Sequence, residues 1–474
     1  MSGKSENGQV QLRIPDIDIG NDWPCSNDVL NRHEEIENLS PVLLNAQAPL
    51  VLAIDSPWGS GKTTFIKLWQ LYLKTQNQVS LYLNAWESDF AEDPLLPMLS
   101  AFDDWLESKK VKSAPKKAWA KAKKYAPGVI KSSAVAAAKA ATFGALDLDK
   151  EYEKLLADMA GKSVGNLVDS YKVKEELLGK FKSVLGDAMS ALPDNQNNLI
   201  VFIDELDRCK PTYAIEMLER IKHLFDIDRV VFVLAINREQ LSKSLQGIYG
   251  PNFDGSHYLK RFIDLDYQLQ IKDVESYIQV KLNQDDLNEY FSSRRDGNND
   301  FGTLSQIIKG VVSRFDYRLR DVEQLITRLR LILKSIPSSH NIDVAVLASL
   351  IVLREQNQVL YKQYVENYIY ANEVIEFLMG RYTEHEKVPD YYAWVAGSLI
   401  RAGKDCYNES DLSSLIKPWE TMLNSMDEND VKRHQIGRII QIAQDNQGLW
   451  DRSNVRKTAF NRIELINRIT IENN

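Results

Sequence analysis

The stretch from Pro49 to Lys74 constrains the fold of this chain most strongly, because it combines three kinds of sequence in a fixed order. An apolar run, Pro49–Ile54, leads into Ser56-Pro-Trp-Gly-Ser-Gly-Lys-Thr63, and Thr64–Lys74 then has helical apolar spacing. The middle segment fits the phosphate-binding pattern G-x-x-x-x-G-K-[ST], except that Ser56 replaces the first glycine. The stretch predicts a strand, a phosphate-binding loop and a helix. The plainer alternative is a tight strand-to-helix turn with a solvated lysine.

The residue types of this loop suit a nucleoside triphosphate with Mg²⁺. Small residues let backbone N–H groups curve around the phosphates, and the helix N-terminus adds partial positive charge. Lys62 supplies a point charge for the β- and γ-phosphates, and the Thr63 hydroxyl is a suitable Mg²⁺ ligand. The predicted nucleotide-binding residues of the loop are Ser56, Trp58, Gly59, Ser60, Gly61, Lys62, Thr63 and Thr64.

Four short apolar runs predict a mostly parallel sheet with helices on both faces, a three-layer α/β fold. Ligands of such sheets bind at the carboxyl ends of the strands. Polar residues stand at those ends: Asn84, Asp204 with Glu205, and Asn237. The predicted strands are Pro49–Asp55, Val79–Ala85, Leu199–Asp204 and Arg229–Ile236.

The third run ends in acidic residues, Leu199-Ile-Val-Phe-Ile-Asp-Glu-Leu-Asp-Arg-Cys209. Asp204 is placed to hold Mg²⁺, and Glu205 is placed to orient or deprotonate an attacking water. Asn84 is predicted to bond that water or Glu205, and Asn237 to contact the γ-phosphate. For these residues the alternatives are an ordinary acidic turn and the capping of the turns that follow the strands.

The length of 474 residues favours two or three domains. We expect an N-terminal arm over 1–27, and a core formed by 28–106 and 194–290. The interval between Thr64 and Asp204 is too long for a plain crossover, which predicts a Lys- and Ala-rich helical insertion over 107–193. Residues 301–474 have helical spacing and predict an all-α C-terminal half.

Three scattered cysteines argue against a disulfide framework, and the polar N-terminus has no signal-peptide core, so we expect a cytoplasmic protein. The net charge is −8, yet residues 108–146 contain ten lysines and no Asp or Glu. This stretch is predicted to be a solvated helical insertion. The alternatives are contact with nucleic acid or with anionic lipid at the inner face of the membrane.

Several further segments resemble the KAP family of P-loop NTPases, over roughly residues 28–335. Leu319 stands where that family usually has proline, and Glu205 where it often has Asp. The segments are Asn84-Ala-Trp86, Phe202-Ile-Asp-Glu-Leu-Asp-Arg-Cys209, Phe232-Val-Leu-Ala-Ile-Asn-Arg-Glu-Gln-Leu241, Tyr258-Leu-Lys-Arg-Phe-Ile-Asp264 and Arg320-Asp-Val322.

The resemblance implies an ATPase related to AAA+ and STAND proteins. Lys62 and Thr63 would bind phosphate and Mg²⁺, Asp204 would bind Mg²⁺, and Glu205 would be the catalytic base. Asp207 and Arg208 belong to the family signature, and a link to phage exclusion or defence is implied for bacterial members.

P-loop ATPases often complete the site with an arginine. Arg320 is the predicted sensor from the helical half, and the other candidates are Arg208, Arg261 and Arg318. For any one of them the alternative is a surface ion pair. An arginine that acts across subunits would imply a homo-oligomer.

Three functions of different kinds fit these patterns. The first is a Mg²⁺-dependent ATP-hydrolysing switch with a separate effector protein. The second is a scaffold that binds nucleotide without hydrolysing it, and a membrane-surface protein anchored by 108–146 is a further alternative. Asn27–Leu44 is predicted to line the base pocket, with Arg32 as a candidate contact, and does not separate ATP from GTP.

Overall fold

The computed structural model divides the chain into two compact units, which we describe separately. The sheet unit comprises Ile17–Lys272, and the helical unit contains Asp273–Asn474. The residues that the structure describes are 22–25, 28–91, 93–107, 179–180, 182–183, 186–187, 198–224, 226–283, 285–292, 297–336, 343–382, 388–402, 409–428, 430–445 and 455–467.

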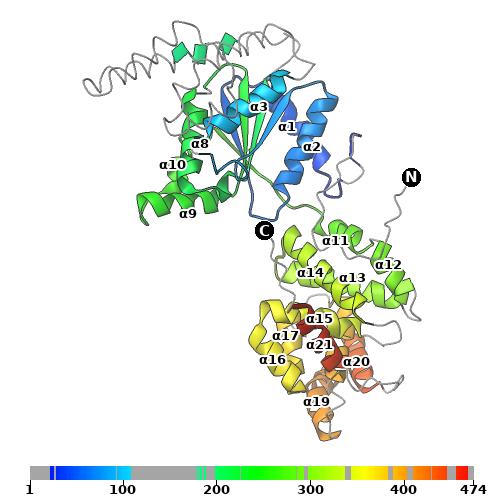
Figure 1. Ribbon diagram of the computed structural model, residues 1–474. Coiled ribbons are helices and arrows are strands. Elements are labelled where there is room, and N and C mark those ends of the chain that lie inside the picture. The colour runs from blue at the N-terminus through cyan, green and yellow to red at the C-terminus, as the bar shows by residue number, and fades with distance from the viewer. Residues whose placement is uncertain are drawn as a thin grey trace. The chain divides into compact units, whose positions relative to one another are not determined.

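The sheet unit is built on five parallel strands in the order β2-β3-β4-β1-β5 (Figure 1). The central strands β3 and β4 are buried along their whole length, which agrees with their unbroken apolar sequences. The strands are β1 (Leu50–Asp55), β2 (Ser80–Asn84), β3 (Leu199–Asp204), β4 (Val230–Ile236) and β5 (Leu265–Gln268).

Helices cover both faces of this sheet, so the predicted three-layer α/β fold is confirmed (Figure 1). Alternate strand residues pack against α1 and α2 on one face, and their neighbours pack against α3, α8 and α9 on the other. The helices of this unit are α1 (Arg32–Leu44), α2 (Lys62–Thr75), α3 (Leu95–Glu107), η1 (Leu206–Arg208), α8 (Pro211–Leu224), α9 (Arg238–Tyr249) and α10 (Gly255–Leu259).

The described part of the helical unit contains no strand, which confirms the prediction of an all-α C-terminal region. Its α15 is buried from Val344 to Leu353, as expected for a helix that is apolar on every side. Its helices are α11 (Val274–Leu282), α12 (Asp285–Ser292), α13 (Gly297–Arg314), α14 (Leu319–Lys334), α15 (Val344–Gln356), α16 (Gln358–Glu366), η2 (Tyr368–Tyr370), α17 (Ala371–Met379), α18 (Asp390–Arg401), α19 (Glu409–Ser425), α20 (Val431–Gln444) and α21 (Val455–Asn467).

The fifth strand was not expected from the sequence. Its residues, Leu265-Asp-Tyr-Gln268, are mostly exposed because β5 is an edge strand paired on one side only with β1. Such a segment lacks the apolar run by which the other four strands are recognised. The predicted domain boundaries stay predictions, and the predicted insertion over 107–193 falls almost entirely outside the described residues, as does most of the predicted arm over 1–27.

Candidate functional site

The loop between β1 and α2 needs glycine at two of its positions. Gly59 and Gly61 have φ angles of 81° and 87°, in the left-handed region that other residues rarely adopt. Gly61 precedes α2, which begins at Lys62, two residues before the predicted helix start. The glycines of the motif therefore set the turn that brings the chain from the sheet into the helix.

Ser56, where the motif usually has glycine, has an ordinary φ and a structural role of its own. Its φ is not positive, and its side chain is buried, with 3% of the residue exposed. Its backbone N–H donates to the Ile236 carbonyl at 3.2 Å, and its hydroxyl donates to the Leu269 carbonyl at 3.1 Å. Serine thus fits this position and ties the loop to the last residue of β4 and to the residue that follows β5.

The loop offers donors that the protein itself does not use. Within the described part of the chain, the backbone N–H groups from Gly59 to Thr64 find no acceptor, and Phe65 is the first to donate, to the Gly61 carbonyl at 2.9 Å. Free N–H groups at a helix N-terminus favour a bound anion. The predicted loop residues, Thr64 included, therefore form a cradle that suits phosphate oxygens.

Lys62 is folded back onto this loop. Its Nζ donates to the carbonyls of Ser56 at 2.6 Å and Pro57 at 3.2 Å, and the residue is 8% exposed. Burial lowers the pKa of Lys62, and the negative charges of Asp207, Asp204 and Asp55 oppose that shift. A phosphate would give the ammonium a better partner than two neutral carbonyls.

At the end of β3 the Asp204 carboxylate is buried, at 1% exposure, and faces the phosphate loop. It accepts hydrogen bonds from the Glu205 backbone N–H at 2.9 Å and from the Tyr82 hydroxyl at 3.3 Å, and the Thr63 hydroxyl is a further donor beside it. Burial raises the pKa of Asp204, and these three donors and Lys62 lower it again. A hydroxyl and a carboxylate are thus paired at the helix start, which is a donor set that fits Mg²⁺.

Glu205 follows in a conformation that is uncommon for its residue type, with φ 60° and ψ 25°. Its Oε1 lies 2.9 Å from the Arg208 guanidinium, and its Oε2 accepts from the Asn84 side chain at 3.3 Å. Desolvation raises the pKa of Glu205, while the Arg208 charge lowers it. Backbone strain of this kind is concentrated at functional sites.

The two predicted asparagines, Asn237 and Asn84, differ in their hydrogen-bond partners. Asn237 caps α9, where its side chain accepts from the Gln240 N–H at 3.2 Å. Asn84 accepts from the Trp86 N–H at 3.1 Å, and its amide group also donates to Glu205. Capping therefore accounts for the described contact of Asn237, whereas Asn84 joins the strand end to the predicted base.

Two aromatic side chains at this edge, Tyr82 and Trp86, were not expected as parts of the site, and a third, Trp58 of the predicted loop, makes a contact that was not expected. Tyr82 contacts Asp204, the Trp58 indole donates to Asp207, and Trp86 lies under Arg208 with Cζ 5.5 Å from the ring centroid. The Asn-Ala-Trp segment marks Trp86 in the sequence, but its pairing with Arg208 is a contact between two loops.

The remaining arginines occupy different places. Arg261 lies over the Tyr258 ring at 5.5 Å in the sheet unit. Arg318 and Arg320 are exposed at the start of α14 in the helical unit, where the Arg318 N–H donates to Asp321 at 3.0 Å. The predicted role of Arg320 as a sensor therefore stays a prediction.

Arg32, the candidate base contact, is 2% exposed at the start of α1. Its guanidinium pairs with Glu35 at 3.3 Å and lies 5.9 Å from the Phe65 ring centroid, while its Nη2 has no hydrogen-bond partner among the described residues. Gln270, whose carbonyl Arg32 also contacts, comes directly after Leu269, to which the phosphate loop is bonded. Arg32 therefore belongs to the framework beside the loop.

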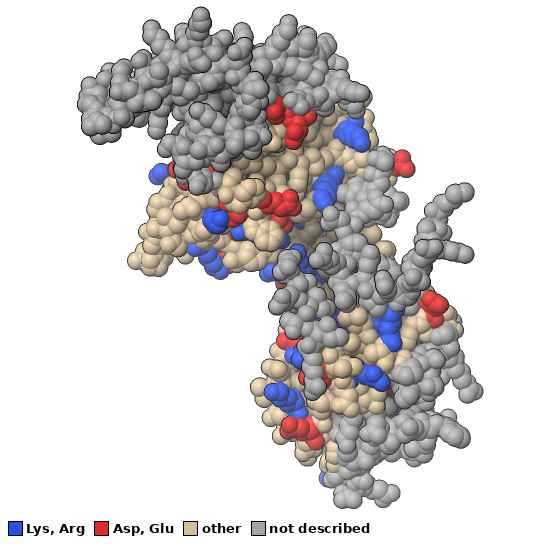
Figure 2. All heavy atoms as spheres, in the orientation of Figure 1, with Lys and Arg blue, Asp and Glu red and all other residues tan. Residues whose placement is uncertain are grey.

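Predictions about nucleic acid or lipid depend on residues 108–146, which lie outside the described residues. On the face shown in Figure 2, acidic and basic side chains of the described residues are interspersed. None of the helices in the described part of the chain is long and apolar enough to span a membrane.

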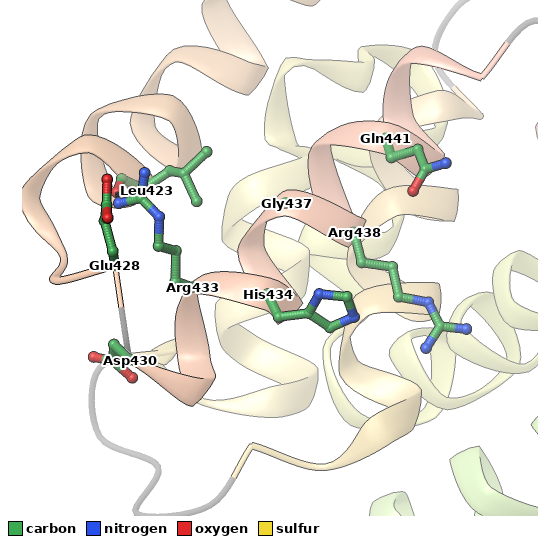
Figure 3. Close-up of a pocket in the computed structure, with 8 residues that line it drawn as sticks. All are labelled: Leu423, Glu428, Asp430, Arg433, His434, Gly437, Arg438 and Gln441. Atoms are coloured by element: carbon green, nitrogen blue, oxygen red, sulfur yellow. Dashed lines mark hydrogen bonds between the residues drawn. The ribbon is translucent and has the colours of Figure 1, made fainter.

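A cavity of about 570 Å³ lies in the helical unit between the end of α19 and α20 (Figure 3). Its Arg433 donates to the carbonyls of Leu423 at 2.7 Å and Met426 at 2.8 Å, and so caps the end of α19. Arg438, which points away from Arg433, lies over Trp394 at 5.2 Å. Both arginines are thus engaged in the packing of the helices.

Comparison with known proteins finds similar sequences and places part of this chain in a family. The chain is 24% identical over 244 residues to the phage T7 exclusion protein of Escherichia coli K12, a match that covers 49% of this chain and 32% of that protein. The chain therefore spans about a third of the length of this relative.

Among solved structures, the Aeropyrum pernix ORC2 protein, in its ADPNP–ADP complexes, aligns over 92% of this chain and 95% of its own at 13% identity. The TM-score of 0.33 is too low to establish a shared fold.

The model of the KAP family P-loop domain matches residues 32–336, which is more than half of the chain and includes the phosphate loop, β3 and η1. This chain therefore belongs to the KAP family of P-loop NTPases.

Proposed function

We propose that this protein is a Mg²⁺-dependent ATPase that acts as a switch or regulator. Membership of a P-loop NTPase family supports nucleotide binding, and the loop supplies N–H donors that have no acceptor among the described residues. On binding, Lys62 would exchange the carbonyls of Ser56 and Pro57 for phosphate oxygens. We propose ATP, and not GTP, as the nucleotide by analogy with the family.

The residues that would hold Mg²⁺ are Thr63 and Asp204, whose side chains lie beside each other. A bound Mg²⁺ would neutralise charge on the phosphates during transfer to water. Two protein ligands suit this ion, because Mg²⁺ in nucleotide sites takes most of its ligands from phosphate and water.

Hydrolysis is supported above all by the position of Glu205. Its carboxylate follows the proposed metal ligand directly and is held by Asn84 from the neighbouring strand end. A carboxylate in this place can accept a proton from water as that water attacks the γ-phosphate. A scaffold that only binds nucleotide would not need this group.

Phosphate release from ATP, measured with Mg²⁺ and with excess chelator, tests the proposal. We expect turnover that requires Mg²⁺ and that Thr63→Ala lowers at limiting Mg²⁺, while Thr63→Ser retains it. Nucleotide binding without any release would favour the scaffold. Failure to bind ATP or GTP would contradict both functions. Light scattering with and without ATP would show whether a homo-oligomer forms.

We also propose a role in the exclusion of phage, in which this ATPase regulates a separate effector protein. The name of the Escherichia coli relative supports this proposal. The efficiency of phage plating on cells that express the wild type or Lys62→Ala is the direct test. We expect protection only with the wild type, and equal plating on both strains would contradict the role.

A further inference from the structure

Two side chains of the short turn η1 reach different loops of the site. Asp207 accepts from the Trp58 indole in the phosphate loop, and Arg208 contacts both Glu205 and Trp86. Leu206 between Glu205 and Asp207 is fully buried and anchors the turn in the core. The turn therefore has a fixed backbone from which Arg208 extends to the carboxylate of Glu205.

The carboxylate of Glu205 is held from two sides. The Arg208 guanidinium lies 2.9 Å from Oε1, and the Asn84 amide donates to Oε2 at 3.3 Å. Each contact reaches one carboxylate oxygen, but Arg208 brings a full positive charge and lies at the shorter distance. Arg208 is thus the stronger of the two constraints on Glu205.

Arg208 is in turn supported by Trp86. The Trp86 backbone is fixed to the end of β2, because its N–H donates to Asn84 Oδ1 at 3.1 Å and the preceding Ala85 N–H donates to the Asp204 carbonyl at 2.9 Å. The side chain itself is 45% exposed, so burial in the core does not explain a tryptophan here. The ring instead supplies a face for the guanidinium, at 5.5 Å from its centroid.

We propose that Arg208 is a positioning residue for Glu205, and that Trp86 holds Arg208 in the orientation that this task requires. This inference rests on the proposed hydrolysis of ATP, and it assigns to Arg208 an action through Glu205 and no contact with nucleotide. Asp204 and Asp207 flank Glu205 with negative charge, and Arg208 places a cation against its carboxylate. Without Arg208 the Glu205 carboxylate would turn away from Asp204 and Asp207. It would then no longer be oriented toward the attacking water.

The steady-state constants of Arg208→Ala, Arg208→Lys and Trp86→Ala test this proposal. Misplacement of a reacting group costs on the order of 10- to 100-fold in rate, so we expect a fall of that size in kcat for Arg208→Ala. The KM for ATP and the affinity for a fluorescent ADP analogue should stay within about twofold, because uniform binding is unchanged. Arg208→Lys should recover part of kcat, since it restores the charge without the planar fork.

A double-mutant cycle separates support of Arg208 from other effects of Trp86. Trp86→Ala should lower kcat by about two- to fivefold, which corresponds to the loss of one partly exposed cation–π contact. In the Arg208→Ala background the same change should have no further effect. Phe90→Ala is the matched control, because Phe90 is in the same loop and is 82% exposed, and it should behave as the wild type.

Three outcomes would overturn the inference. A tenfold loss of nucleotide affinity in Arg208→Ala would show that Arg208 contacts the nucleotide itself. Independent, multiplicative effects of Trp86→Ala and Arg208→Ala would remove the support role. Full activity of Arg208→Ala, with thermal unfolding unchanged, would leave Arg208 without a part in the reaction. An inactive wild type, or a Glu205→Gln variant with full turnover, would instead overturn the proposed function and this inference with it.

Discussion

Two aspartates end parallel strands of the same sheet, yet their surroundings differ. Asp55 at the end of β1 accepts from the Arg238 backbone N–H and from the Gln268 side chain, each at 2.9 Å. Asp204 at the end of β3 lies beside the hydroxyl of Thr63, in the first turn of the helix after the phosphate loop. The first carboxylate ties α9 and β5 to β1, whereas the second is paired with a predicted metal ligand.

The difference shows that a carboxylate at a strand end is not by itself evidence of a site. What distinguishes Asp204 is its neighbour, because Thr63 in the first turn of α2 lies beside it. We therefore expect substitutions at the two strand ends to have different kinds of effect, on chemistry at β3 and on stability at β1.

Removal of the Lys62 ammonium should have the largest effect. Lys62→Ala should weaken ATP binding by about 100-fold or more, because a buried cation that meets phosphate contributes a charge-assisted hydrogen bond in a poorly hydrated place. The empty protein should keep its thermal stability, since the two carbonyl bonds of Lys62 are offset by relief from burying a charge. Calorimetric titration and a melting curve measure both. Unchanged affinity would contradict the assignment of the loop.

Alanine at each aspartate is the direct test of the comparison. Asp204→Ala should lower Mg²⁺-dependent turnover by about 100-fold or more, because the proposed metal loses a ligand. Asp55→Ala should keep turnover within about threefold and should lower the free energy of unfolding by about 1–3 kcal/mol, because the Arg238 N–H and the Gln268 amide lose their acceptor. Turnover and urea unfolding should be measured on both variants. The reverse pattern would show that the two strand ends have been assigned wrongly.

Ser56→Gly restores the usual residue of the motif and should have the smallest effect. The change removes the hydrogen bond from the Ser56 hydroxyl to the Leu269 carbonyl and raises the conformational entropy of the unfolded chain. It should therefore lower the free energy of unfolding by about 1 kcal/mol. ATP affinity should change by less than about twofold. A marked gain in affinity would mean that the serine restricts the loop, contrary to the geometry described above.

The sequence predicted well those strands that are buried on both faces of the sheet. Leu199–Asp204 forms a strand with the predicted ends, because β3 is apolar throughout and stops at an acidic turn. Leu265–Gln268 was missed, because an exposed edge strand needs no apolar run. The predicted start of α2 is two residues too late. The motif assigns Lys62 and Thr63 to the phosphate-binding loop, although their backbones are already helical.

The site was predictable to the extent that its contacts follow from the motif. The loop, Thr63 and Asp204 are brought together by the strand–loop–helix arrangement and by parallel pairing, both of which the sequence indicates. The contacts of Trp58 with Asp207 and of Trp86 with Arg208 join segments far apart in the chain through side-chain orientation. No periodicity or spacing encodes such contacts, so they required the structure.

The central claim is that the end of β3 carries the chemistry of ATP hydrolysis. The most direct test is the identity of the nucleotide that Glu205→Gln carries after incubation with ATP and Mg²⁺ and rapid removal of free nucleotide. We predict that the variant carries ATP, because binding is intact and the base is lost, whereas the wild type carries ADP. A Glu205→Gln protein that carries ADP as the wild type does would contradict the account.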